Sequence, residues 1–137
     1  MFQFEGGETV KEFDSDKPIY IQIREKIEDQ ILTGLLKEGE QAPSTNQLVQ
    51  FYKVNHITVA KGVNQLVDEG ILYKKRGVGM FVAEGAREKL LKQRKEKFLN
   101  EYLVKLLEEA EILGITEVEL IDFIKRMKGR KANGRVD

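Results

Sequence analysis

The chain has 137 residues, of which 34% are charged and 41% are apolar, and its formal net charge at pH 7 is zero. This balance is typical of one folded domain, or of a small domain with an appendage, and it argues against a disordered chain. The absence of cysteine excludes disulfides and thiolate metal sites and suits a reducing cytoplasm, and no apolar run approaches the roughly 18 residues of a membrane span.

The first 34 residues divide into an arm and a helix. Residues 1–16 mix acidic residues with scattered phenylalanines and a Gly-Gly break, and we expect a loosely ordered N-terminal arm there. Pro18 suits the first position of a helix, because its missing N–H would be unpaired in any case. An apolar row then repeats every four residues and ends before Gly34; its members are Ile19, Ile23, Ile27 and Ile31. The spacing predicts an amphipathic helix behind the elements that follow.

A second, short helix begins after Pro43. Ser44 and Gln47 have the spacing of a capping box, in which each side chain satisfies a free backbone N–H near the other residue. Leu48, Phe51 and Tyr52 follow at helical spacing. The sequence therefore predicts a helix of about two turns that starts at Ser44.

A third, longer helix is predicted between Asn55, a capping residue, and Gly70, which suits a left-handed helix end. Its inward row comprises Val59, Val63, Leu66 and Val67. Gly62 lies in the middle of this helix, where glycine costs about 1 kcal/mol relative to alanine. We expect the glycine to permit close approach of the preceding short helix. The alternative is a locally loosened third helix, which would weaken its sequence specificity.

The opposite face of the third helix carries polar and β-branched side chains: Ile57, Thr58, Lys61, Asn64, Gln65 and Asp68. Its N-terminal half combines a hydroxyl, an ammonium and an apolar group. These are the groups that contact base edges in a DNA major groove.

Two short strands are predicted at 71–73 and 80–82, joined by the basic tip 74–79 with its two glycines. Residues 1–72 hold 7 Lys/Arg and 12 Asp/Glu, a net charge of −5, whereas residues 73–137 hold 16 and 11, a net charge of +5. An anionic partner is therefore attracted mainly through the hairpin and the segment after it. Helix, turn, helix and hairpin together indicate a winged helix-turn-helix domain over residues 17–83.

The motifs of this domain resemble those of the GntR family of bacterial transcription regulators. They are PIYIQI (18–23), Gly34-Leu35, APS (42–44), VNHITV (54–59), LVDEGIL (66–72) and GVGMFV (77–82). The family usually has arginines at the positions of Asn46 and His56, and both contact DNA, so an operator poorer in contacted guanines is expected here. The resemblance and the exposed chemistry together imply a double-stranded DNA partner, contacted by Ser44, Thr45, Asn46, Asn55, His56, Thr58, Lys61, Gln65, Lys74, Lys75, Arg76, Gly77 and Gly79.

Residues 84–128 are predicted to form a helical region, whose first helix follows a short hinge at 83–86. A long helix over 87–113 acquires a heptad-like apolar seam from Leu99 onward, and Thr116 with Glu119 forms a second capping box before a short helix. Both helices expose apolar residues that a partner must cover, and the expected dimer interface comprises Leu99, Leu103, Leu106, Leu113, Ile121 and Ile124. Residues 129–137 are expected to be a disordered tail.

This C-terminal part resembles the YtrA-type branch of GntR regulators, whose short helical region dimerises. The expected fold is thus mainly α with a small β wing, followed by a helical dimerisation hairpin. The alternative is that these helices fold back on the chain's own wing domain.

No enzyme is expected, because the chain has one histidine and no plausible acid–base pair, and neither a metal site nor a cofactor is predicted. Two functions remain. The first is a cytoplasmic, homodimeric, sequence-specific repressor that binds an inverted-repeat operator, with a small-molecule effector left open. The second is a winged-helix interaction module with weakened DNA binding.

Overall fold

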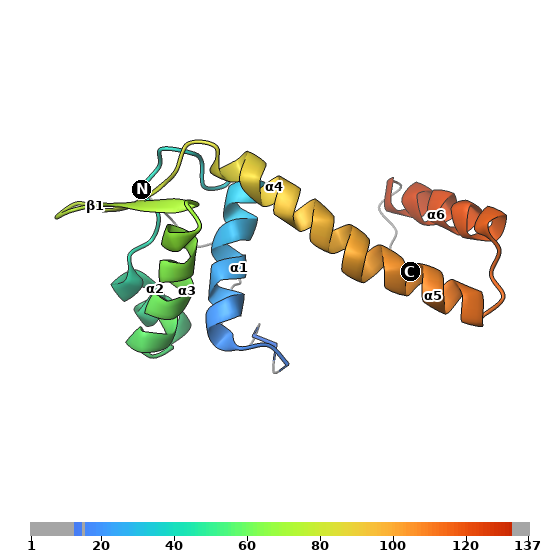
Figure 1. Ribbon diagram of the computed structural model, residues 1–137, viewed down its shortest axis with the longest axis horizontal. Coiled ribbons are helices and arrows are strands. Elements are labelled where there is room, and N and C mark those ends of the chain that lie inside the picture. Colours follow the sequence, from blue (N-terminus) through green and yellow to red (C-terminus); the bar gives the residue numbers. More distant parts are fainter. Residues whose placement is uncertain (1–12, 15, 133–137) are drawn as a thin grey trace. The chain divides into compact units, whose positions relative to one another are not determined.

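The computed structural model describes residues 13–14 and 16–132 and contains two compact units, Met1–Gln93 and Arg94–Asp137. The elements are α1 (Ile19–Leu32), α2 (Thr45–Tyr52), α3 (His56–Asp68), β1 (Leu72–Lys75), β2 (Gly79–Val82), α4 (Ala86–Lys97), a π-helical segment (Phe98–Leu103), α5 (Val104–Ile112) and α6 (Glu117–Ala132) (Figure 1). The predicted fold class, mainly helical with a small β wing, is confirmed. Most of the expected N-terminal arm lies outside the described residues.

In the first unit, α1 and α3 lie side by side and α2 packs against α3 (Figure 1). The isoleucine row of α1 enters the core at Ile23, Ile27 and Ile31, whereas Ile19 is exposed. Pro18 was predicted to be the first residue of the helix, but it is the N-cap, and α1 begins one residue later at Ile19. The core is completed by buried apolar residues from every other element of the unit, among them Leu36, Leu48, Tyr52, Val59, Val63, Leu66, Ile71, Leu72, Val82 and Leu90.

Local capping positions α2 and α3 as predicted. The Ser44 Oγ accepts from the Gln47 N–H at 3.0 Å, and the Gln47 side chain accepts from the Ser44 N–H at 2.9 Å. The Asn55 side chain accepts from the Thr58 N–H at 2.9 Å. Between the helices, Lys53 takes a left-handed conformation with φ of 58°, which allows the tight turn without a glycine.

The two strands are longer than predicted. β1 and β2 pair antiparallel from Leu72 opposite Val82 to Lys75 opposite Gly79, so the first two basic residues belong to a strand and the turn is shorter. The loop before α2 adds a third line of pairing. The Gly39 N–H donates to the Val82 carbonyl at 2.9 Å, and the Ala42 N–H donates to the Met80 carbonyl at 2.8 Å. This pairing holds β2 from both sides.

Gly62 lies against a different helix from the one that was predicted. A Cβ built on Gly62 would lie 2.5 Å from the carbonyl oxygen of Tyr20, and no atom of α2 is among its near neighbours. The glycine therefore permits close approach of α1, and the predicted contact with α2 was wrong. Only a residue without a Cβ lets the two backbones come this close.

The predicted hinge at 83–86 belongs to the first unit and is fixed there by hydrogen bonds. The Glu38 carboxylate accepts from the N–H groups of Gly85 at 2.9 Å and Arg87 at 3.2 Å, at the start of α4, and these bonds lower the pKa of Glu38. Ala86 and Leu90 are buried in the core. The Lys89 ammonium donates to the Glu69 carbonyl, close to the C-terminal end of α3. The first turn of α4 is thus an ordered part of this unit.

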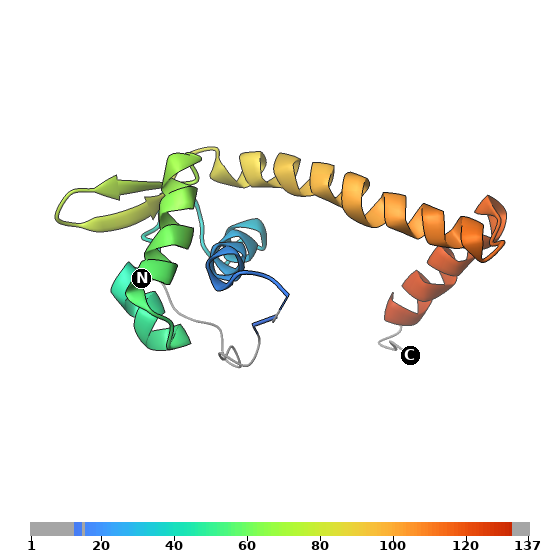
Figure 2. The same ribbon diagram turned by 60° about the horizontal axis from the view of Figure 1, so that its bottom comes forward.

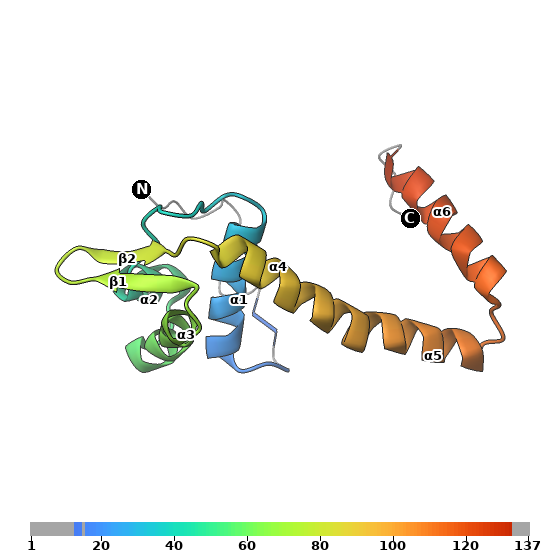
Figure 3. The same ribbon diagram turned by 45° about the horizontal axis from the view of Figure 1, so that its top comes forward.

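The second unit differs from the predicted helices in two details. The expected continuous α-helix is interrupted by the π-helical segment Phe98–Leu103, whose wider turn shifts the apolar residues around the axis relative to a regular heptad. α6 continues to Ala132, so residues 129–132 of the expected tail are helical, and 133–137 lie outside the described residues. The predicted capping box is confirmed, since the Glu119 N–H donates to the Thr116 Oγ1 at 3.2 Å and the Thr116 N–H donates to Glu119 at 3.1 Å. After Gly114 the chain turns back, and α6 diverges from α5 (Figure 3).

Candidate nucleic-acid interface

The N-terminal ends of α2 and α3 carry the predicted reading residues. Ser44, the N-cap of α2, and Asn46 are exposed and Thr45 is half-buried, and the Ser44 hydroxyl is engaged in the capping box. In α3, Asn55 and His56 are exposed. The structure therefore brings these side chains to the surface of one helix pair, although two of them also cap helices.

The first turn of α3 has an orientation set by its buried row. Val59 and Val63 are 0% and 1% exposed, and they face the core. Thr58 is half-buried, and its backbone N–H is held by Asn55. Ile57, in contrast, is 78% exposed. The outward surface of this turn is thus partly apolar.

Further along α3, three polar side chains contact other parts of the first unit. The Lys61 ammonium lies 4.1 Å from the ring centre of Tyr20, a cation–π distance. The Gln65 side-chain oxygen accepts from Arg24 at 2.9 Å, and the Asn64 oxygen accepts from Lys74 at 3.4 Å. Lys61 and Gln65 therefore interact with α1, a feature that a helical wheel of α3 alone does not reveal.

Arg24 of α1 is central to this contact between helices, and sequence reasoning missed it. Its guanidinium donates to both oxygens of Glu69, at 2.7 and 2.8 Å, and to Glu28 at 3.0 Å. The hydrogen bond from Arg24 lowers the pKa of Glu69, and the same pairing raises the pKa of Arg24. The available signal was the Arg24–Glu28 spacing of four, which favours an ion pair on a helix. The network ties the C-terminal half of α3 to α1.

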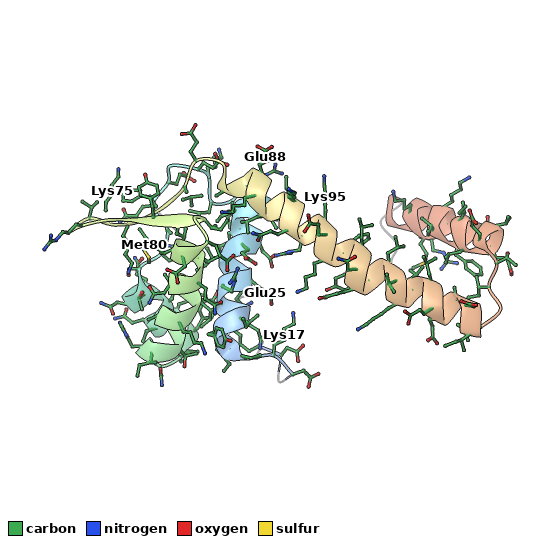
Figure 4. All side chains as sticks on the ribbon, in the orientation of Figure 1. Lys17, Glu25, Lys75, Met80, Glu88 and Lys95 are labelled. Carbon is green, nitrogen blue, oxygen red and sulfur yellow. The ribbon has the colours of Figure 1, made fainter. Side chains whose placement is uncertain are left out.

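The wing presents its cations on a hairpin that extends from the helices of the first unit (Figure 2). Lys74, Lys75 and Arg76 are all exposed, and Figure 4 shows Lys75 on the hairpin. The Lys75 ammonium lies 4.4 Å from the ring centre of Phe81, which stacks on Tyr73 with centroids 5.8 Å apart. Packing on rings limits the conformations of the lysine while leaving its charge accessible.

The two wing glycines have different reasons to be glycine. Gly77, with φ of 76°, makes the turn and has open space around it. Gly79 has φ of 141°, and a Cβ there would lie 2.6 Å from the side-chain nitrogen of Gln41. That nitrogen donates to the Val78 carbonyl at 3.2 Å. Gln41 thus holds the base of the tip, a role that no local sequence pattern indicated.

The predicted interface residues of the second unit are exposed. The side chains of Leu99, Leu103, Leu106, Leu113, Ile121 and Ile124 all lie at the surface of the described chain. Leu99 and Leu103 belong to the π-helical segment, so they do not continue the α5 row in the regular seam that was expected. No described residue of the second unit covers these apolar side chains.

Two further properties bear on the kind of site. Among the described residues no group of three or more His, Cys, Asp or Glu could hold a metal ion. Within the same part of the chain, no helix is both long and apolar enough to cross a membrane. The chemistry on the surface consists of hydrogen-bonding side chains, three wing cations and an exposed isoleucine.

Comparison with known proteins agrees with this arrangement. The family described as "Bacterial regulatory proteins, gntR family" matches residues 19–82. The HTH-type transcriptional repressor YtrA of Bacillus subtilis is 32% identical over 123 residues, covering 87% of this chain and 94% of the relative. The HTH-type transcriptional regulator YhcF of the same organism is 32% identical over 114 residues, covering 83% and 93%.

A solved structure extends the likeness to both units. A putative GntR-family transcriptional regulator from Bacteroides thetaiotaomicron has a TM-score of 0.70 at 33% identity, and the match covers 82% of this chain and 98% of that one. The match is longer than the first unit, so it extends into the helical region beyond the wing. The chain belongs to the gntR family of bacterial regulatory proteins.

Proposed function

We propose that the protein is a homodimeric transcriptional repressor that binds an inverted-repeat operator. The observation that carries this proposal is the capped α2–α3 pair with an exposed basic wing, in a member of a family of DNA-binding regulators. The N-terminal end of α3 would enter the major groove, as recognition helices of helix-turn-helix proteins do. Repression is supported by the similarity to YtrA, which is named a repressor.

The apolar surface of the second unit supports the homodimer. Fourteen large apolar side chains of residues 98–127 are exposed, and extensive exposed apolar surface in soluble proteins is typical of interaction sites. A second copy is the natural cover, because a two-fold axis places the same residues of both chains against each other. The same axis would arrange two α3 helices for an inverted repeat.

Base reading in this proposal rests on Asn46, Asn55, His56, Thr58, Lys61 and Gln65. Asparagine pairs with adenine, whereas the arginines usual in the family favour guanine, so we expect an operator with few contacted guanines. Gln65 contacts Arg24 in the free protein and must change partners to reach a base. Lys61 has more freedom, since a cation–π contact at an exposed site contributes only about 0.5–1 kcal/mol.

Selection of bound sites from a random DNA pool tests the proposal. We expect an enriched inverted repeat, and sedimentation of the complex should give two protein chains per site. Thr58→Ala or Lys61→Ala should reduce discrimination between the selected site and random DNA more than changes in the wing do. Recovery of no enriched sequence would reject the repressor and favour the interaction module.

The wing supplies a second, independent test. Lys74→Ala/Lys75→Ala/Arg76→Ala should weaken binding to specific and random DNA alike, because each neutralised phosphate releases counterions. The slope of log affinity against log salt should flatten by about one unit for each phosphate that the variant no longer neutralises. Lys125→Ala/Lys128→Ala, which removes two exposed charges from α6, is the control. An unchanged slope in the triple variant would mean that the wing does not contact DNA.

A further inference from the structure

Ile57 is an exposed apolar residue on a face where the proposed function needs DNA contacts. It is the second residue of α3, and 78% of its surface is accessible. The helix cannot turn it inward, because Val59, Val63 and Leu66 are buried on the opposite side. Gly62 also holds α3 close to the backbone of α1. Packing of the whole unit therefore keeps this isoleucine at the surface.

Unlike Ile57, the polar residues further along α3 already have partners within the free protein. Lys61 lies over Tyr20, Asn64 accepts from Lys74, and Gln65 accepts from Arg24. Of these residues, Lys61 and Gln65 are assigned to base reading, and each must give up its internal contact to reach DNA. Ile57 has no hydrogen bond to exchange, so it gains whenever an apolar group covers it. Its branched side chain is also stiff, which limits the entropy lost on binding.

The major-groove edge of a base pair has one apolar group, the 5-methyl of thymine. The first residues of a recognition helix are those that contact base edges. On this basis we infer that Ile57 contacts the 5-methyl group of a thymine in each operator half-site. The inference rests on the proposed function and adds to it a base preference that the polar residues do not supply.

Replacement of thymine by uracil isolates this contact, because it removes the methyl and leaves the hydrogen-bonding edge unchanged. Each thymine of the selected operator is replaced in turn, symmetrically in both half-sites, and affinity is measured at fixed salt. Removal of one buried methyl corresponds to about a fourfold loss of affinity, so two half-sites predict a loss of about 16-fold at one position.

The variant Ile57→Ala completes a thermodynamic cycle. It should bind the thymine operator more weakly, and uracil at the sensitive position should then change its affinity by less than about twofold. Ile57 is exposed, so the variant should unfold at the same temperature as the parent chain. Val78→Ala is the matched control: Val78 is a similarly exposed apolar residue, 60% accessible, at the wing tip. This variant should keep the full uracil effect.

The outcomes separate the inference from the proposed function. An enriched operator with no uracil-sensitive position overturns the inference and leaves the repressor in place. A uracil effect that persists undiminished in Ile57→Ala also overturns it, because another residue must then contact the methyl. Failure to recover any operator overturns both. A sensitive thymine whose effect disappears only in Ile57→Ala supports the inference.

Discussion

The two units of this chain use similar helix signals and bury their apolar residues very differently. The first unit closes around Ile23, Leu48 and Leu66, each 1% exposed or less, and around the buried residues packed with them. In the second unit, among residues 94–130, Ala110 is the one buried side chain. Yet a capping box starts α2 in the first unit and another precedes α6 in the second. Helix formation and burial are therefore separate properties here.

Local signals alone do not make a stable unit. Isolated helices shorter than about 12–15 residues are marginal in water, and most helix stability in proteins comes from packing. Among residues 104–130, which include α5 and most of α6, Ala110 is the one buried side chain, so packing inside the unit adds little to helix stability. The first unit supplies its own packing, whereas the second, in our proposal, obtains it from another copy of the chain.

The largest effect should come from changing the exposed surface of the second unit. Leu103→Glu/Leu106→Glu should convert the dimer to monomers, because two carboxylates would be desolvated at the interface. Operator affinity should fall by about 100-fold or more, since the two reading domains would no longer be linked. Sedimentation and a binding titration measure the two effects.

Lys105→Glu is the control for this variant. It changes the net charge by the same amount at an exposed position between the two leucines in sequence. It should leave the dimer intact if apolar contact is the cause. Sedimentation of the parent chain as a monomer at micromolar concentration would contradict the dimer itself.

A single added methyl should have opposite effects in the two units. Gly62→Ala places a Cβ against the Tyr20 backbone and should lower the free energy of unfolding by about 1–2 kcal/mol, even after the gain in helix propensity. Gly129→Ala lies in α6 with nothing within 4 Å of the new Cβ, and should stabilise its helix by up to about 1 kcal/mol. Denaturant unfolding followed by circular dichroism distinguishes them. If Gly62→Ala stabilised the protein as much as Gly129→Ala, the added methyl group would be accommodated by a low-cost separation of α1 and α3.

The smallest expected difference concerns an arginine in each unit. Arg24→Gln removes the half-buried bonds to Glu69 and Glu28 and should destabilise by about 1–2 kcal/mol. Arg126→Gln breaks an exposed pair with Asp122, 3.0 Å apart, and should cost less than about 0.5 kcal/mol. Thermal unfolding at neutral pH compares the two variants.

The ion pair between Arg24 and Glu69 predicts that the stability of the protein depends on pH. The pKa of Glu69 is lower in the folded protein, so the folded state binds fewer protons and is favoured above the unfolded pKa of about 4.3. This contribution is lost as pH falls through the folded pKa of Glu69. The variant Arg24→Gln lacks this contribution. The free energies of unfolding of the parent chain and the variant should therefore approach each other as the pH falls. A difference in the free energy of unfolding that stays constant throughout the acid range would assign the stabilisation to packing.

Most helix starts and the presence of the wing were predictable from the sequence because they depend on neighbouring residues. The capping boxes at Ser44 and Thr116 join groups three positions apart, and the isoleucine row of α1 has the period of its own helix. The basic hairpin was predictable in the same way, although Lys74 and Lys75 belong to β1 and not to the turn. The family resemblance rests on the same local motifs.

Tertiary structure alone decided which neighbour each residue meets. Gly62 faces α1 and not α2, Gln65 bonds to Arg24, and Gln41 holds the wing tip. Glu38 caps a helix that begins nearly fifty residues later. These contacts join segments about 40 residues apart or more, and their geometry depends on how all the helices pack together. No local period or spacing records that packing, because it is a property of the assembled core.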